Sequence, residues 1–243
     1  MPGNTPWSGS ASDKLYLQSG EFSATLKTSL SVTGVDTTPA GISWDGTNTP
    51  WIGDQANRLY LQSGQFSATM KTSVAAADNN PSGISWDQTN TPWIGFQSDK
   101  LYLQSGQFSA TLKTSRAIGI INAGPTGIAW DGADTPWTGV TTNQKLYLQS
   151  GEFSATLKTS FSVAGVEASP EDVSWDQTNT PWVGSASDKL YLQSGQFSAT
   201  MKTSLSVGGV DATPFGIENT NRLAAAEKAA PAERLRLLIG VGR

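Results

Sequence analysis

Residues 41–73 read GISWDGTNTPWIGDQANRLYLQSGQFSATMKTS, and this stretch decides the fold because it recurs along the chain. The string Leu-Tyr-Leu-Gln-Ser-Gly occurs five times, and Thr-Pro-Trp occurs five times at intervals of 42–45 residues. A third landmark, Trp-Asp, occurs four times. Repeats of this length are typical of solenoids and propellers, in which each repeat is one supersecondary unit.

The repeat divides into four short strands. In the quoted copy we expect them at residues 41–44, 49–53, 59–62 and 66–72. Apolar residues at alternate positions, aromatic and β-branched side chains, and short turns containing glycine indicate an antiparallel meander. No helical periodicity appears before residue 218. Each repeat therefore predicts one four-stranded blade.

The two ends of the repeat array predict a closed ring. The chain opens with Asn4-Thr5-Pro6-Trp7, which corresponds to the second strand of a blade, and residues 214–217 match the start of a first strand. Closure removes the exposed edges and apolar faces that an open array would leave. We predict an all-β, five-bladed β-propeller over residues 1–217, closed by a composite blade. Residues 218–243 predict a short, Ala-rich helical tail.

The blade motif is similar to that of known propellers. Pro-x-Gly-Ile-x-Trp-Asp-Gly-x-Asn-x-x-Trp-x-Gly, found at residues 39–53 and followed by Arg58-Leu59-Tyr60, resembles propeller repeats of the NHL and SMP-30-like type. The resemblance covers residues 1–217 and implies the fold. Trp-Asp-Gly followed by Trp-x-Gly also resembles the fucose-binding propeller lectins, which hold sugar with an Arg, a Glu and a stacking Trp. No Arg is repeated here, so the resemblance to these lectins and to tachylectin-type lectins is one of architecture.

Composition excludes several classes of chemistry. The 243 residues include no Cys and no His, so disulfides, Cys nucleophiles, His bases and the usual zinc sites are ruled out, and we expect no cofactor and no metal. The net charge of −4 argues against nucleic-acid and anionic-membrane partners. We expect no signal peptide and no transmembrane segment. The localisation stays open: synthesis in the cytoplasm is expected, and a place in a virion is compatible with the sequence.

Sequence diversity falls on the connections between strands two and three and between blades, which share one rim of the ring. Loops on a rigid scaffold commonly carry binding residues, although they also vary because little constrains them. Phe96 and Arg116 depart most clearly from the repeat and are candidate ligand-binding residues.

The tryptophans of Thr-Pro-Trp are further ligand-binding candidates, since an indole provides a large, rigid face for a sugar. They are Trp7, Trp51, Trp93, Trp137 and Trp182. The alternative, which the sequence favours, is that they bury the faces between blades.

Acidic residues give two further expectations. The Asp of each Trp-Asp pair fits an Asx turn better than a calcium site. Asp134, Glu171 and Asp172 are the acids that depart from the repeat, and we expect them in turns. Because near-identical repeats present the same residue from every blade, they are unsuited to separating a catalytic acid from a base. We therefore expect no enzymatic activity.

These observations favour a non-enzymatic, multivalent binding module, with carbohydrate as the ligand, held at repeated sites between blades or on the rim. Repetition increases the avidity of weak sites. The alternative is a structural or assembly protein: a phage or virion surface or tail component, or an engineered repeat scaffold, which uses residues 218–243 to bind another subunit or partner. Near-identity of the copies fits either recent amplification or design.

Overall fold

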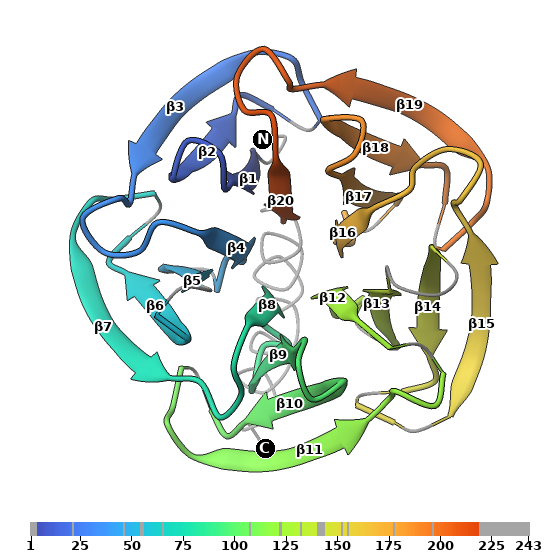
Figure 1. The fold of residues 1–243 in the computed structure, drawn as a ribbon, viewed down its shortest axis with the longest axis horizontal. Helices are drawn as coiled ribbons and strands as arrows, with labels where there is room; N and C mark the ends of the chain where they lie inside the picture. The colour runs from blue at the N-terminus through green and yellow to red at the C-terminus, as the bar shows by residue number, and fades with distance from the viewer. Residues whose placement is uncertain are drawn as a thin grey trace, which may run out of the picture.

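The computed structural model describes residues 4–218, except residues 21, 46, 54–55, 65, 107, 122, 132, 140–143, 152, 155, 177 and 196. Within these residues, twenty strands form five four-stranded antiparallel sheets, which surround a common centre as the blades of a ring (Figure 1). The predicted five-bladed β-propeller is confirmed. The predicted helical tail, beyond Glu218, lies outside the described residues.

Every blade has the same strand order from the centre of the ring to its outside. Blade 1 comprises β20 (Pro214–Ile217), β1 (Thr5–Gly9), β2 (Lys14–Gln18) and β3 (Leu26–Ser31). Blade 2 comprises β4 (Pro39–Ile42), β5 (Thr49–Gly53), β6 (Arg58–Gln62) and β7 (Met70–Ala75). Blade 3 comprises β8 (Pro81–Ile84), β9 (Thr91–Gly95), β10 (Lys100–Gln104) and β11 (Leu112–Ala117). Blade 4 comprises β12 (Pro125–Ile128), β13 (Thr135–Gly139), β14 (Lys145–Gln149) and β15 (Leu157–Ser162). Blade 5 comprises β16 (Pro170–Val173), β17 (Thr180–Gly184), β18 (Lys189–Gln193) and β19 (Met201–Ser206).

The composite blade closes the ring as predicted. Strand β20 pairs antiparallel with β1, with Trp7 opposite Ile217. The Ser10 N–H donates to the Thr213 carbonyl at 3.0 Å, which extends the ladder beyond the strands. The last strand thereby pairs with the inner edge of β1 and completes the first sheet.

Two of the four strands are shifted relative to the sequence prediction. The first strand of blade 2 is Pro39–Ile42, two residues earlier than expected, and the fourth begins at Met70 instead of residue 66. Phe66 has a φ of 59°, a left-handed conformation that cannot continue a strand. A hydrogen bond of 2.8 Å from Ser63 N to the Thr69 carbonyl closes the longer turn instead.

A stacked pair of aromatic rings lies in every blade. The indole of Trp51 faces the ring of Tyr60 on the adjacent strand, with centroids 4.4 Å apart, and the four other copies have the same geometry at 4.1–4.3 Å. Apolar side chains of neighbouring blades complete the core; Ile52 of blade 2, for example, belongs to the same cluster as Trp93 of blade 3. The core therefore lies between blades and joins each blade to the next.

The turns after the innermost strands have the expected Asx geometry. The Asp45 carboxylate accepts the backbone N–H of Thr47 at 2.8 Å, two residues along the chain. Equivalent bonds to Asp87, Asp131 and Asp176 form in blades 3, 4 and 5. These aspartates thus fix the turn, as predicted.

Candidate functional site

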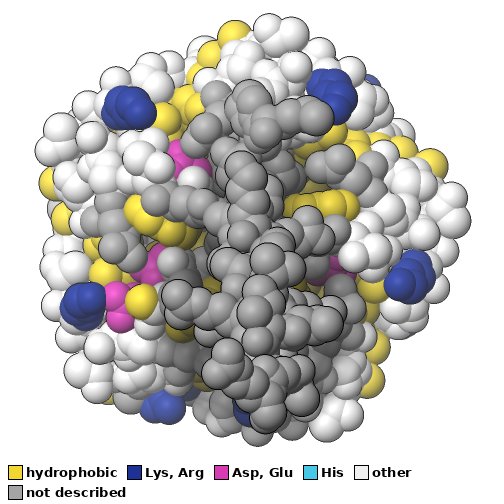
Figure 2. Space-filling model, turned by 180° about the vertical axis from the view of Figure 1, so that it is seen from behind, with side chains coloured by type: hydrophobic (Ala, Val, Ile, Leu, Met, Phe, Trp, Pro, Cys, Tyr) yellow, Lys and Arg dark blue, Asp and Glu magenta, His cyan; other side chains and the backbone are white. Residues whose placement is uncertain are grey.

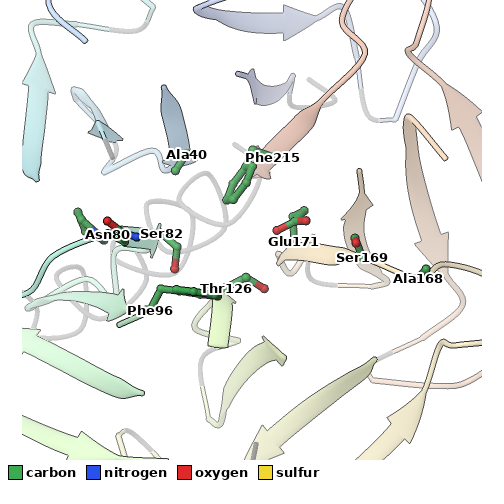
Figure 3. Close-up of a pocket in the computed structure, with 10 residues that line it drawn as sticks. Ala40, Asn80, Ser82, Phe96, Thr126, Ala168, Ser169, Glu171 and Phe215 are labelled. Atoms are coloured by element: carbon green, nitrogen blue, oxygen red, sulfur yellow. The ribbon is translucent and has the colours of Figure 1, made fainter. Parts of the chain in front are cut away.

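A cavity of about 480 Å³ lies at the centre of the ring, within the size range of small-molecule sites (Figure 3). All five blades contribute to its wall through the second residue of their innermost strands. These residues are Ala40, Ser82, Thr126, Glu171 and Phe215. Further lining residues come from the variable connections, among them Asn80, Phe96 and Ser169. The variable rim predicted from sequence therefore forms the mouth of the cavity.

Among the strand residues, the five wall positions have a different residue in every blade. The innermost strands read PAGI, PSGI, PTGI, PEDV and PFGI, so a constant proline is followed by a different residue in every blade. By contrast, Thr-Pro-Trp and Leu-Tyr-Leu-Gln are identical in all five copies. The cavity consequently has no fivefold symmetry, although the ring around it does.

Solvent exposure does not explain this variation. The outermost strands all contain Lys-Thr-Ser, whose residues are exposed or half-exposed, yet this triplet is the same in every blade. The wall residues Ala40, Ser82, Thr126 and Glu171 are buried and differ. Variation is not confined to the wall, since the fifth residue of the outermost strands is Leu30, Val74, Arg116, Phe161 or Leu205, but exposure alone does not predict which positions vary.

The innermost strands of neighbouring blades are in close contact at the centre of the ring. A β-carbon at Gly83 would lie 2.7 Å from both the Gly127 Cα and the Thr126 carbonyl oxygen of the next blade. Gly41 and Gly216 are equally confined by backbone atoms of their neighbours. Glycine is required at these three positions because no side chain fits between the adjoining strands there.

Glu171 places a buried carboxylate in the wall. Only 8% of the residue is exposed, and its side chain points toward the cavity (Figure 3). The Ser185 hydroxyl donates to Oε1 at 2.7 Å. Burial, with a smaller contribution from the nearby Glu167, raises the pKa of Glu171 to about 7. The cavity therefore contains an acid that titrates near neutral pH.

Glu171 and Asp172 lie on strand β16, not in turns, which corrects the expectation from sequence. Asp172 occupies the position that is glycine in the other blades, and its carboxylate accepts the backbone N–H of Ile217 at 3.0 Å. Burial raises the pKa of Asp172 well above its usual range. Asp134 does lie in a turn, where it pairs with Lys158 at 2.6 Å.

The two hydroxyl residues of the wall also hold neighbouring blades together. Thr126 Oγ1 donates to the Pro170 carbonyl of the next blade at 3.0 Å, and Ser82 Oγ donates to the Pro125 carbonyl at 3.4 Å. Phe215 and Phe96 supply the aromatic surface and are both half-buried. Figure 3 shows the Phe215 and Phe96 side chains on separate parts of the wall.

The tryptophan candidates lie elsewhere. Trp7, Trp51, Trp93, Trp137 and Trp182 are at most 1% exposed. Each indole is covered by its partner tyrosine and by the adjoining blade, so a ligand could reach these rings only if the blades separated. The five indoles lie between blades, which is the arrangement that the favoured interpretation describes. Ligand binding by these residues stays a prediction.

The two rim candidates, Phe96 and Arg116, lie in different parts of the structure. Phe96 lines the central cavity. Arg116 lies on the outer strand β11, and its Nε donates to the Phe153 carbonyl of blade 4 at 3.1 Å. The contacts of Arg116 therefore join two blades and do not reach the cavity.

Sequence reasoning missed Phe215 as a site residue and misplaced Glu171. A signal for both was present, since the x of the Pro-x-Gly-Ile motif takes a different residue in every copy. This position belongs to a strand, whereas the rim candidates were taken from the variable connections.

No group of three or more acidic side chains in the described part of the chain is arranged to hold a metal ion. None of the elements described is a helix long and apolar enough to span a bilayer.

No protein family and no curated protein matches the sequence. Solved structures do share its fold. One is a nidogen/laminin complex (TM-score 0.59, 14% identity, 86% of this chain and 81% of that chain). Another is glutaminyl cyclase from Myxococcus xanthus (TM-score 0.54, 11% identity, 79% and 75%). A third is a protein of unknown function from Bacteroides caccae (TM-score 0.52, 9% identity, 86% and 74%). At these identities the likeness shows the propeller fold alone.

Proposed function

We propose that this propeller is a non-enzymatic binding module that holds one small ligand in its central cavity. The observation that carries the proposal is that the innermost strands, which read Pro-x-Gly-Ile in four of the five blades, have a different residue in every blade at the position that lines this cavity. Five different side chains around one space produce an asymmetric site, and asymmetry is what distinguishes one small molecule from another.

The cavity wall favours binding over catalysis. Glu171 is its one carboxylate among the described lining residues. The carboxylate of the adjacent Asp172 is directed to the backbone of β20, where it accepts a hydrogen bond. Hydrolysis by paired acids needs two carboxyl groups facing the same substrate. Phe96 and Phe215 instead provide apolar contact area, and the mouth provides polar groups that orient a ligand.

Carbohydrate remains one ligand class for this site, because a sugar can stack on phenylalanine and bond to Glu171. The proposal differs from a multivalent lectin in stoichiometry. We expect one ligand per chain, whereas repeated sites between blades would bind several. Isothermal titration calorimetry with any ligand found by screening saccharides and small amines measures this number directly.

Two tryptophan substitutions in one loop locate the site. Ala168 is exposed and lines the mouth, whereas Ala164 is exposed in the same connection but does not line it. Ala168→Trp should block binding and Ala164→Trp should not, with both proteins melting at the wild-type temperature. A ligand that binds the Ala168→Trp protein as well as wild type, or that binds with a stoichiometry near five, contradicts the proposal.

The second candidate is an assembly role, favoured by apolar residues exposed on the interblade connections. These include Val35, Ile120, Val166 and Val210, with exposed fractions of 43%, 99%, 50% and 46%. Multi-angle light scattering of the full chain and of a chain that ends at Glu218 tests it. Discrete oligomers that dissociate after this truncation would support attachment through the C-terminal segment.

A further inference from the structure

The basic residues of the ring lie on its outer strands. Every described Lys and Arg lies on the third or fourth strand of a blade, away from the centre. Figure 2 shows the dark-blue basic side chains toward the periphery of one face, with acidic side chains nearer the middle. The described residues that line the cavity include no Lys and no Arg.

Three carboxyl groups lie on or directly after the innermost strands. Glu171 lies in the wall, Asp172 follows it, and Glu218 is buried just after β20, where it accepts hydrogen bonds from Ser43 and Ser174 at 3.1 Å and 3.0 Å. Glu167 is also buried behind the mouth. Glu171 lines the cavity, and its described lining residues include no Lys or Arg, so an ionised Glu171 is costly and a cation in the cavity relieves that cost.

The remaining wall is suited to an organic cation. Phe96 and Phe215 offer aromatic surface, which attracts ammonium groups and also covers apolar carbon. Ala40 and Pro81 add further apolar surface. A bare metal ion would need several oxygen or nitrogen ligands at short range, whereas the wall presents a single carboxylate.

From these contacts we infer that the central cavity binds an organic ammonium ion with an apolar group, its nitrogen against Glu171 and its apolar part against Phe96 and Phe215. The inference rests on the proposed binding function and adds the class of ligand. An ionised Glu171 disfavours the binding of an anion at this site. A neutral molecule of the same shape forfeits the charge-assisted hydrogen bond.

Three probes of nearly equal size test whether the cavity prefers a positively charged ligand. Benzylammonium, benzyl alcohol and phenylacetate share one aromatic group and differ in the polar end. Titration of the full chain at about pH 8, where Glu171 is ionised, should give affinities at least about tenfold higher for benzylammonium than for benzyl alcohol. Phenylacetate should bind more weakly than either.

Glu171→Gln is the matched variant, because it keeps the size and hydrogen-bonding ability of the side chain and removes its charge. In this variant, the ratio of the affinity for benzylammonium to the affinity for benzyl alcohol should fall to nearly one. A thermal melt verifies that the variant is folded.

The outcomes separate the inference from the function on which it rests. If benzyl alcohol or a saccharide binds as well as benzylammonium and is blocked by Ala168→Trp, the cavity is a binding site but the ligand class is wrong. If benzylammonium does not bind wild type at millimolar concentration, or keeps its preference in Glu171→Gln, the ligand class is also overturned. If benzylammonium binds the Ala168→Trp protein unchanged, the cavity itself is the wrong site.

Discussion

The hydroxyl oxygen of Ser8 accepts a hydrogen bond from the backbone N–H of Gly216 at 2.8 Å, across 208 positions of sequence. The same hydroxyl donates to the Ala40 carbonyl of blade 2. The Ser8 side chain, on the second strand of blade 1, thus connects the closing strand β20 to blade 2. The ring, and with it the cavity, exists only after these distant segments meet.

Removal of the closing strand should abolish the folded ring. A chain that ends at Thr213 lacks β20, so β1 loses its inner partner and the Ile217 side chain leaves the core. We expect aggregation or loss of cooperative unfolding, measured by circular dichroism and light scattering. A chain that ends at Glu218 keeps every described contact and should unfold cooperatively. Wild-type-like unfolding of the shorter chain would contradict closure by β20.

The stacked tryptophans should contribute mainly to stability. Trp51→Ala removes a fully buried indole and should lower the free energy of unfolding by about 3–5 kcal/mol. Trp51→Phe keeps a ring against Tyr60 and should cost clearly less. Urea unfolding monitored by circular dichroism measures both. Equal stability of Trp51→Ala and wild type would show that the stack does not hold the blade.

The close approach of the innermost strands at their glycines predicts different losses of stability for two glycine-to-alanine substitutions. Gly83→Ala would place its β-carbon against backbone atoms of blade 4, with a loss of about 1–3 kcal/mol or more in the free energy of unfolding. Gly165→Ala meets nothing within 4 Å and should change stability by less than about 0.5 kcal/mol. Similar unfolding midpoints for the two variants would be inconsistent with strands in contact at the centre.

Glu171 should make the protein less stable as the pH rises toward and above 7. Its folded pKa of about 7 exceeds the ordinary value of 4.5, so between these values the native state binds more protons than the unfolded state. The free energy of unfolding therefore falls with increasing pH, by about 3 kcal/mol at most. The raised pKa of Asp172 acts in the same direction.

Glu171→Gln isolates the contribution of this residue. Relative to wild type, the variant should gain stability at about pH 8 compared with about pH 5, as measured by urea unfolding. A difference between the two proteins that is the same at both pH values would mean that Glu171 has no raised pKa.

The repeat made most of the fold predictable. Thr-Pro-Trp and Leu-Tyr-Leu-Gln fixed the second and third strands, because their alternation of side chains matches a two-sided sheet. The fourth strand was placed too early because the positive φ of Phe66 leaves no mark in the alternation. In blade 5, the sequence Pro-Glu-Asp-Val lacks the usual Gly-Ile, so Glu171 and Asp172 were expected in a turn.

The cavity was harder to predict than the strands. Its wall takes one residue from each blade, and Ala40, Ser82 and Thr126 give no chemical signal when considered alone. Only ring closure brings them together with Glu171 and Phe215. The tryptophans attracted attention as ligand candidates because of their chemistry, yet the same chemistry suits them to the spaces between blades.

A crystal structure of the full chain with benzylammonium tests the central claim most directly. We predict density for one molecule per chain, in the central cavity between Glu171 and Phe215. Density repeated at equivalent positions between the blades, with none in the cavity, would contradict it.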